Sequence, residues 1–144
     1  MIANLAALHI DAPADTVFAY ISDPAKLDRW SFGTWQTILH PDGLIEGQGL
    51  ANGFKALMRI DADPTRLIVD YHLGATDGDL RPRIFARVVP GAVTGHAHNS
   101  AALLLTALRT TDMDDTRWGQ LCRAHAAELD IIKGQIETGF DPKA

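Results

Sequence analysis

The chain has 144 residues, of which 47% are apolar and 22% charged, and its 13 Lys and Arg against 18 Asp and Glu give a net charge of −5. Such a chain folds as one globular domain on its own hydrophobic core, without a disulfide or structural metal as a staple. The negative charge argues against a nucleic-acid-binding protein, because these proteins need a broad positive field. We therefore predict a single domain over residues 1–144.

The sequence carries no recognisable targeting or membrane-spanning signal. The N-terminus has no basic region followed by an apolar run, so we expect no signal peptide. The longest apolar run, Ala101–Leu105, is far shorter than the ~18 residues that indicate a membrane span. Cys122 is the single cysteine, which excludes an intrachain disulfide and fits a reducing compartment. We predict a cytoplasmic protein.

The first thirty residues predict a strand followed by two short helices. Apolar and polar residues alternate in a strand over about residues 5–10. Pro13 suits the first position of a helix. Asp23-Pro24 ends that helix and caps a second one. In the second helix Leu27 and Trp30 are three apart, so both can point inward.

Between residues 35 and 110 the apolar period changes to two, which predicts strands. Pro41-Asp42-Gly43, Asp63-Pro64-Thr65 and Pro90-Gly91 are turn signals. Gly47 and Gly49 interrupt one strand and predict a bulge or a sharp bend. About six short strands separated by turns, with no helix between them, indicate an antiparallel meander.

The last thirty residues predict one long helix from about Asp115 to Thr138. Its stripe recurs at spacings of three and four and contains Trp118, Leu121, Cys122, His125, Leu129, Ile132 and Ile136. Gly139 is placed to end the helix. A helix of about 36 Å with one apolar face needs a broad apolar surface, and the sheet is the surface that can supply it.

This element order predicts an α+β fold in which a curved antiparallel sheet wraps around the long C-terminal helix. Because sheets twist, the helix stripe and the concave face of the sheet cannot meet everywhere. We expect a cavity between them, lined mainly by apolar side chains. Such a cavity is typical of a binding site for a small molecule.

The segments LHIDAPADTVF (residues 8–18), ISDP (21–24) and LDRW (27–30) resemble the start of the START-like superfamily, also called SRPBCC. In element order the resemblance extends to nearly the whole chain. It implies the helix-grip fold: a curved antiparallel sheet of about seven strands around a long C-terminal helix, with two short helices after the first strand. The nearest branch is that of the small bacterial polyketide cyclases and dehydratases.

His125 and Tyr71 are polar residues on otherwise apolar faces. His125 lies in the middle of the helix stripe, where it either bonds a ligand or acts as a general base, or is a core histidine with a protein partner. Burial keeps the ring neutral in both cases. The Tyr71 hydroxyl donates either to a ligand or across the core. Met58, on the neighbouring strand, is expected in the wall of the cavity.

Three tryptophans and the cysteine complete the candidate ligand-binding residues. Trp30 and Trp35 lie in the region that in the superfamily tends to border the pocket, although ordinary core positions are the alternative. Trp118 is expected in the core at the start of the long helix. Cys122 is three residues before His125, so a reactive pair is geometrically possible. Inert packing is the usual role of a buried cysteine.

Two further groups of residues have an ordinary explanation. His96 and His98 could bind a metal together with His72, but two histidines without a third ligand at a recognisable spacing favour exposed side chains. Arg83 and Arg87, with Arg81 nearby, are expected to form a stripe on the convex, solvated face of the sheet. We expect neither a metal nor a cofactor.

The expected function is binding of a small apolar or aromatic molecule in the cavity between the sheet and the C-terminal helix. One alternative is an enzyme of the polyketide cyclase or dehydratase type, in which His125 and Tyr71 move protons. The other is a protein-interaction module. The sequence has no phosphate-binding glycine loop, nucleophile elbow or Cys-x-x-Cys pair.

Overall fold

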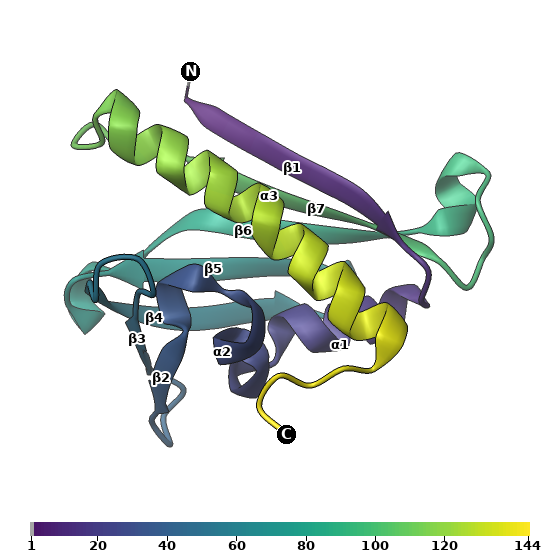
Figure 1. The fold of residues 1–144 in the computed structure, drawn as a ribbon, viewed down its shortest axis with the longest axis horizontal. Coiled ribbons are helices and arrows are strands. Elements are labelled where there is room, and N and C mark those ends of the chain that lie inside the picture. Colours follow the sequence, from purple (N-terminus) through teal and green to yellow (C-terminus); the bar gives the residue numbers. More distant parts are fainter. Residues whose placement is uncertain (1) are drawn as a thin grey trace.

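The computed structural model describes residues 2–144, which form a seven-stranded antiparallel sheet and three α-helices. The strands are β1 (Ala3–Ile10), β2 (Gln36–Leu39), β3 (Ile45–Gln48), β4 (Lys55–Asp63), β5 (Ile68–Gly74), β6 (Arg81–Pro90) and β7 (Ala101–Leu108). The helices are α1 (Ala14–Ser22), α2 (Leu27–Trp30) and α3 (Asp115–Thr138). The strand order is β1-β7-β6-β5-β4-β3-β2. The α+β helix-grip architecture is thus confirmed: α3 runs across the sheet, while α1 and α2 cover one end (Figure 1).

The two short helices form where the sequence signals place them. Pro13 stands just before α1, one position earlier than expected. The Asp23 carboxylate accepts a hydrogen bond from the Ala25 N–H at 2.9 Å and so caps the 3₁₀ turn that leads into α2. Leu27 and Trp30 both point into the core, as the three-residue spacing predicts.

The ends and the C-terminal half of α3 are fixed by polar contacts. The Asp114 side chain accepts from the Arg117 N–H at 2.7 Å, and Gly139 ends the helix with a positive φ of 73°. In the C-terminal half, Gln135 accepts from the Tyr20 hydroxyl and donates to the Arg29 carbonyl oxygen at 2.7 Å. These contacts tie the end of α3 to α1 and α2.

The concave face of the sheet and α3 enclose the main core. Leu129 and Ile132 of α3 pack with buried side chains from β3 to β7, namely Ile45, Met58, Val69, Tyr71, Ala86, Val88, Leu103 and Leu105. A second, smaller cluster joins Ala107, Met113 and Trp118 at the start of α3. Ile84 contacts both clusters.

Gly47 does not bend its strand, contrary to the sequence expectation. β3 pairs in continuous register with β2 and β4 through this residue. A Cβ atom at position 47 would lie 2.6 Å from Cγ2 of Thr34, which belongs to the 3₁₀ turn Phe32–Thr34. The glycine therefore allows this turn to lie directly on the sheet. Trp35 follows the turn and precedes β2, so it stands outside the strand it was expected to open.

The expectation that Arg83 lies on the convex face is wrong. The pairs Tyr71–Ile84 and Leu73–Arg81 leave two residues of β6 opposite one residue of β5, which is a β-bulge. A bulge interrupts the alternation of side chains, and here it turns Arg83 toward α3. Its Nη1 atom is fully buried, whereas Arg87, beyond the bulge, remains exposed.

Candidate functional site

A group of polar side chains is buried between the sheet and the middle of α3. It comprises Trp30 of α2, Thr34 of the 3₁₀ turn, Arg83 of β6, and His125 and Glu128 of α3, and we call it the interior polar cluster. His125 and Glu128 are only 4% and 5% exposed. Their surroundings are apolar, because Leu129 and Ile132 of the same helix belong to the main core.

Four atoms of the interior polar cluster are buried and have no hydrogen-bond partner within residues 2–144. They are Trp30 Nε1, Thr34 Oγ1, Arg83 Nη1 and His125 Nδ1. Buried polar atoms in proteins are nearly always paired, because an unpaired one costs about 1–3 kcal/mol. Such unpaired buried atoms are candidate positions for hydrogen bonds to a polar group of another molecule.

His125 and Glu128 are adjacent on α3 and have strongly altered acidities. Their closest atoms, Nε2 and Oε1, are 3.9 Å apart, which is too long for a hydrogen bond. Burial, helped by the charge of Arg83, lowers the pKa of His125 to about 4. Burial raises the pKa of Glu128 to about 7, although the Phe32 N–H donates to its Oε2 at 3.0 Å. Near neutral pH, His125 is uncharged and Glu128 can both take and give a proton.

Tyr71 is bound within the core. Its hydroxyl donates to the Ile21 carbonyl oxygen at 2.6 Å, at the end of α1. Its ring meets the Trp30 ring edge to face, with the centroids 6.3 Å apart. The sequence left open whether the Tyr71 hydroxyl donates to a ligand or across the core. In the structure it donates across the core.

The other candidate residues occupy three different places. Met58 is buried in the main core. Trp118 lies in the second cluster, as expected, with the Arg109 guanidinium 5.9 Å from its ring centroid. Cys122 packs partly against that cluster and also borders a groove of about 440 Å³ between β1 and α3. Trp35 is separate from all of these.

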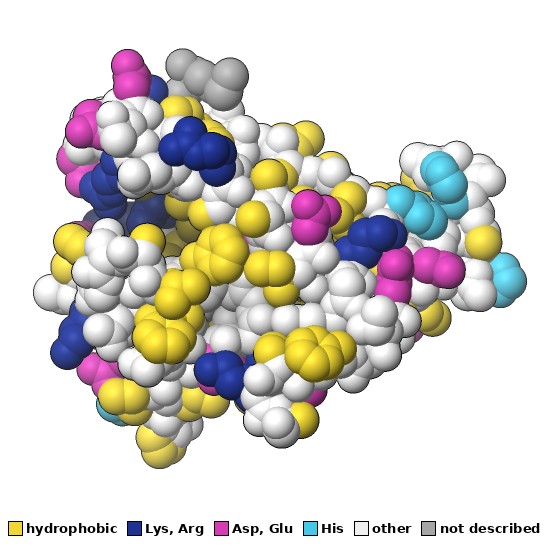
Figure 2. All heavy atoms as spheres, in the orientation of Figure 1, with side chains coloured by type: hydrophobic (Ala, Val, Ile, Leu, Met, Phe, Trp, Pro, Cys, Tyr) yellow, Lys and Arg dark blue, Asp and Glu magenta, His cyan; other side chains and the backbone are white. Residues whose placement is uncertain are grey.

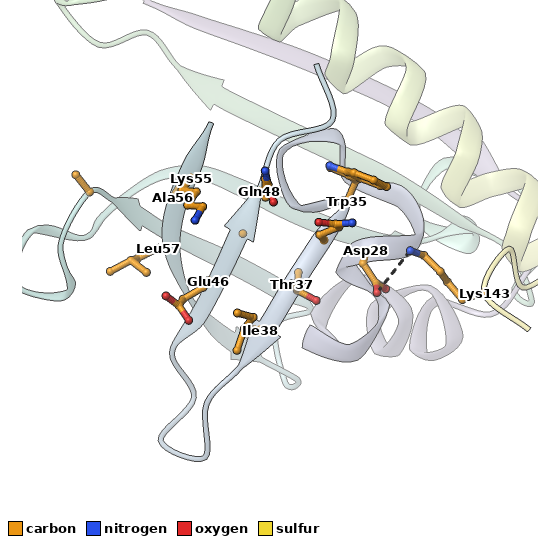
Figure 3. A pocket seen from close by; sticks show the side chains of 13 residues that line it. Asp28, Trp35, Thr37, Ile38, Glu46, Gln48, Lys55, Ala56, Leu57 and Lys143 are labelled. Carbon is orange, nitrogen blue, oxygen red and sulfur yellow. Dashed lines mark ion pairs between the residues drawn. The ribbon is translucent and has the colours of Figure 1, made fainter. Parts of the chain in front are cut away.

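Trp35 borders a larger groove of about 670 Å³ at the β2 end of the sheet (Figure 3). The side chains that line it come from β2, β3 and β4 and include Thr37, Gln48 and Lys55. Asp28 and Lys143 form an ion pair of 3.9 Å at its border. The lining is mixed in polarity, unlike the apolar surroundings of the interior polar cluster.

The molecular surface is hollowed beside the N-terminal half of α3. Figure 2 shows this hollow between α3 and the connection from β3 to β4, with basic and hydrophobic side-chain atoms visible in its depth. The C-terminal half of α3, in contrast, is closed onto α1 and α2 by the contacts of Gln135. We therefore take the hollow as the entrance to the interior polar cluster.

The histidines do not gather as a metal site would require. His72 lies with Asp61 and Asp70 on the outer face of β4 and β5, with their ligand atoms within 4.8 Å of one another. His96 instead stacks on His9, with the ring centroids 4.6 Å apart. Asp61 is exposed, and acidic groups on an open sheet face commonly lie together without an ion, so we assign no metal to this cluster.

Sequence reasoning missed three members of the interior polar cluster, and one of them, Thr34, carries no local signal. Glu128 stands three residues after His125, so a charged residue on the apolar side of the helix was the available signal. Arg83 follows Pro82, and a proline inside a strand favours a bulge because it cannot donate to the ladder. Both signals are local, but neither shows that the two side chains meet.

No protein-family model and no curated protein matches the chain by sequence. Solved structures do match. The di-domain aromatase/cyclase BexL from the BE-7585A biosynthetic pathway has a TM-score of 0.67 and 21% identity over 95% of this chain, which spans about half (47%) of BexL. The Zhui aromatase/cyclase from Streptomyces sp. R1128 has a TM-score of 0.68 and 18% identity over 94% of this chain and 93% of its own.

A START superfamily protein from Mycobacterium smegmatis has a TM-score of 0.68 and 12% identity, over 97% of this chain and 100% of its own. These similarities span nearly the whole of the present chain. The protein therefore has the START-like helix-grip fold, near the structures of the polyketide aromatase/cyclases. No helix within residues 2–144 combines the length and apolar character needed to cross a bilayer.

Proposed function

We propose that the protein binds a small, largely apolar or aromatic molecule between the concave face of the sheet and α3. The observation that carries this proposal is the set of four buried, unpartnered polar atoms within apolar walls. A ligand with an apolar skeleton and a few oxygen atoms would fill the space and complete these hydrogen bonds. Two structural neighbours are aromatase/cyclases, which is consistent with such a ligand.

In this proposal, His125 and Thr34 bond the oxygen atoms of the ligand. Trp30, Met58 and Tyr71 form the wall, and Trp118 lies near the entrance at the start of α3, whereas Cys122 borders the separate groove between β1 and α3. Trp35 borders the separate groove, and we propose no ligand contact for it. The single cysteine and the negative net charge support a cytoplasmic protein that acts without a nucleic-acid partner.

Titration calorimetry with 2-naphthol tests the proposal. The wild type is expected to bind it, and His125→Leu should weaken binding about tenfold or more, because a buried hydrogen bond to the ligand oxygen is lost. His40→Leu is the matched control, since His40 is an exposed histidine that pairs with Glu46 at 2.8 Å.

The control variant should bind as the wild type does. A wild type that binds no apolar aromatic molecule, together with capture of a protein partner through its surface, would favour the interaction-module alternative. Thermal unfolding of each variant shows whether the fold is retained.

An acid–base enzyme is the second candidate, and the pKa of about 7 for Glu128 is the observation that favours it. Loss of water from a β-hydroxyketone removes a proton from the carbon beside the carbonyl group and adds one to the departing hydroxyl group. A single carboxyl group that titrates near neutral pH can do both. Since the Tyr71 hydroxyl already donates to a backbone oxygen, Glu128 replaces it as the partner of His125 in this candidate.

Dehydration of an aryl β-hydroxyketone, followed by the absorbance of the enone, tests the enzymatic candidate. Glu128→Gln should lower turnover at least about tenfold, within the usual contribution of a general acid or base, while binding of the product stays within a factor of about two. Glu46→Gln, at an exposed His–Glu pair, is the control. Equal turnover in both variants would remove Glu128 as a catalyst.

A further inference from the structure

The bulge in β6 places Arg83, a partly buried positive charge, toward α3 without an ion-pair partner among residues 2–144. None of the ion pairs formed among residues 2–144 includes Arg83, and its Nη1 atom is buried without a partner. Buried charges in proteins are normally paired, because removing an ion from water is costly. The guanidinium cannot escape this cost by losing its proton at neutral pH.

The charged groups nearest to Arg83 do not neutralise it. Burial and the charge of Arg117 lower its pKa, whereas the charge of Asp112 raises it. Asp112 already accepts a hydrogen bond from Thr110 and lies 3.6 Å from Arg117. The described residues therefore give Arg83 no ion-pair partner of its own.

His125 supplies a second buried atom without a hydrogen-bond partner in the part of the chain that the structure describes. His125 lies close enough to Arg83 for the guanidinium to lower its pKa. Its Nδ1 atom has no partner, and the side chain is nearly fully buried. In the tautomer with a proton on Nδ1, the ring offers a hydrogen bond beside a fixed positive charge. Glu128 lies on the other side of the ring, 3.9 Å from Nε2.

We propose that Arg83 and His125 together bind a carboxylate of the ligand, whose apolar skeleton extends from there along the main core. A carboxylate is planar, has two accepting oxygens and matches the donors of a guanidinium. This inference rests on the proposed function and narrows it: the ligand is an apolar or aromatic acid. The hollow at the N-terminal half of α3 admits the acid end toward Arg83.

Titration calorimetry with 2-naphthoate and 2-naphthamide tests the assignment, because the two probes have nearly the same shape and differ in charge. The wild type should bind the acid about tenfold or more tightly than the amide. Arg83→Met should abolish this preference while retaining affinity for the amide, and Arg83→Lys should keep part of it. Arg87→Met, on the same strand but exposed, should leave the preference unchanged.

Thermal unfolding gives a second readout that does not depend on any ligand. If Arg83 is a buried charge held for a ligand, Arg83→Met should raise the melting temperature of the free protein. A lower melting temperature together with an unchanged preference for the acid would overturn the assignment. Equal wild-type affinities for acid and amide would overturn the carboxylate site alone, whereas failure of both probes to bind would overturn the proposed function as well.

Discussion

His125 and Glu128 affect the stability of the protein in opposite directions as the pH changes. The folded-state pKa of His125 is lowered from 6.5 to about 4, so its contribution is present above pH 6.5 and is lost as the pH falls toward 4. The pKa of Glu128 is raised from 4.5 to about 7, so its contribution is present below pH 4.5 and is lost as the pH rises toward 7. Between about pH 4 and 7 the two effects largely cancel in the wild type.

Single substitutions should reveal each effect. In Glu128→Gln the free energy of unfolding should rise with pH between about 4 and 6.5, because only His125 remains. In His125→Leu it should fall between about 4.5 and 7, because only Glu128 remains. Each change in pKa corresponds to roughly 3 kcal/mol in the free energy of unfolding.

Urea unfolding at several pH values between 3.5 and 8, against the wild type, measures both slopes. The exposed variant Glu46→Gln should follow the wild-type curve, since its carboxylate stays in water. Parallel curves for the wild type and both interior variants would show that these two groups titrate as they do in the unfolded chain.

At the level of elements, the interior polar cluster depends on two local irregularities. The bulge in β6 turns Arg83 inward. The close approach at Gly47 seats the 3₁₀ turn on β3 and so brings Thr34, and Phe32 with its N–H bond to Glu128, over the sheet. The bulge directs Arg83 to a place that a regular strand would not give it, whereas the missing side chain of Gly47 leaves room for the turn that carries Thr34.

Gly47→Ala should lower the free energy of unfolding by about 1–3 kcal/mol, as overpacking of a tight contact does. The added Cβ would lie 2.6 Å from Thr34 Cγ2 and 3.3 Å from the Gly33 carbonyl oxygen. Gly33→Ala is the control, because a Cβ there meets nothing within 4 Å. Chemical denaturation measures both variants.

A double variant tests the cause of this loss. Thr34→Ser removes the methyl group from the contact, so it should restore part of the stability of Gly47→Ala. If the double variant is no more stable than Gly47→Ala alone, the clash with the threonine methyl group is not the cause.

For the whole molecule, the sequence predicts the architecture more fully than the site. The helix stripe from Trp118 to Ile136 and the period-two strands describe large repeating patterns, and these survive local irregularities. The assignment of Arg83 to the convex face failed because one extra residue in β6 reverses the side-chain directions on the far side of the bulge. Glu128 was missed because its burial and its hydrogen bond from the Phe32 N–H join residues that are far apart in the sequence.

Among the candidate ligand residues, some were recognised from the sequence pattern and others were placed only by the folded structure. His125 was recognised because a polar residue stands out in an apolar stripe. Trp35 and Trp30 look alike in sequence, yet one borders an outer groove and the other joins the interior polar cluster. That difference arises from where the 3₁₀ turn between them meets β3, and no periodicity describes it.

The pairing of β1 with β7 has a consequence for how the chain folds as it is made. The paired residues are 91 to 105 positions apart, so β1 cannot pair with β7 until residues 101–108 have been made. Helix α3, which covers the concave face of the sheet, is made after β7. Until α3 has been made, the apolar concave face of the sheet, which packs against α3 in the folded protein, is exposed to water and to other chains. We therefore expect a nascent chain that depends on chaperones until residues 115–138 have been made.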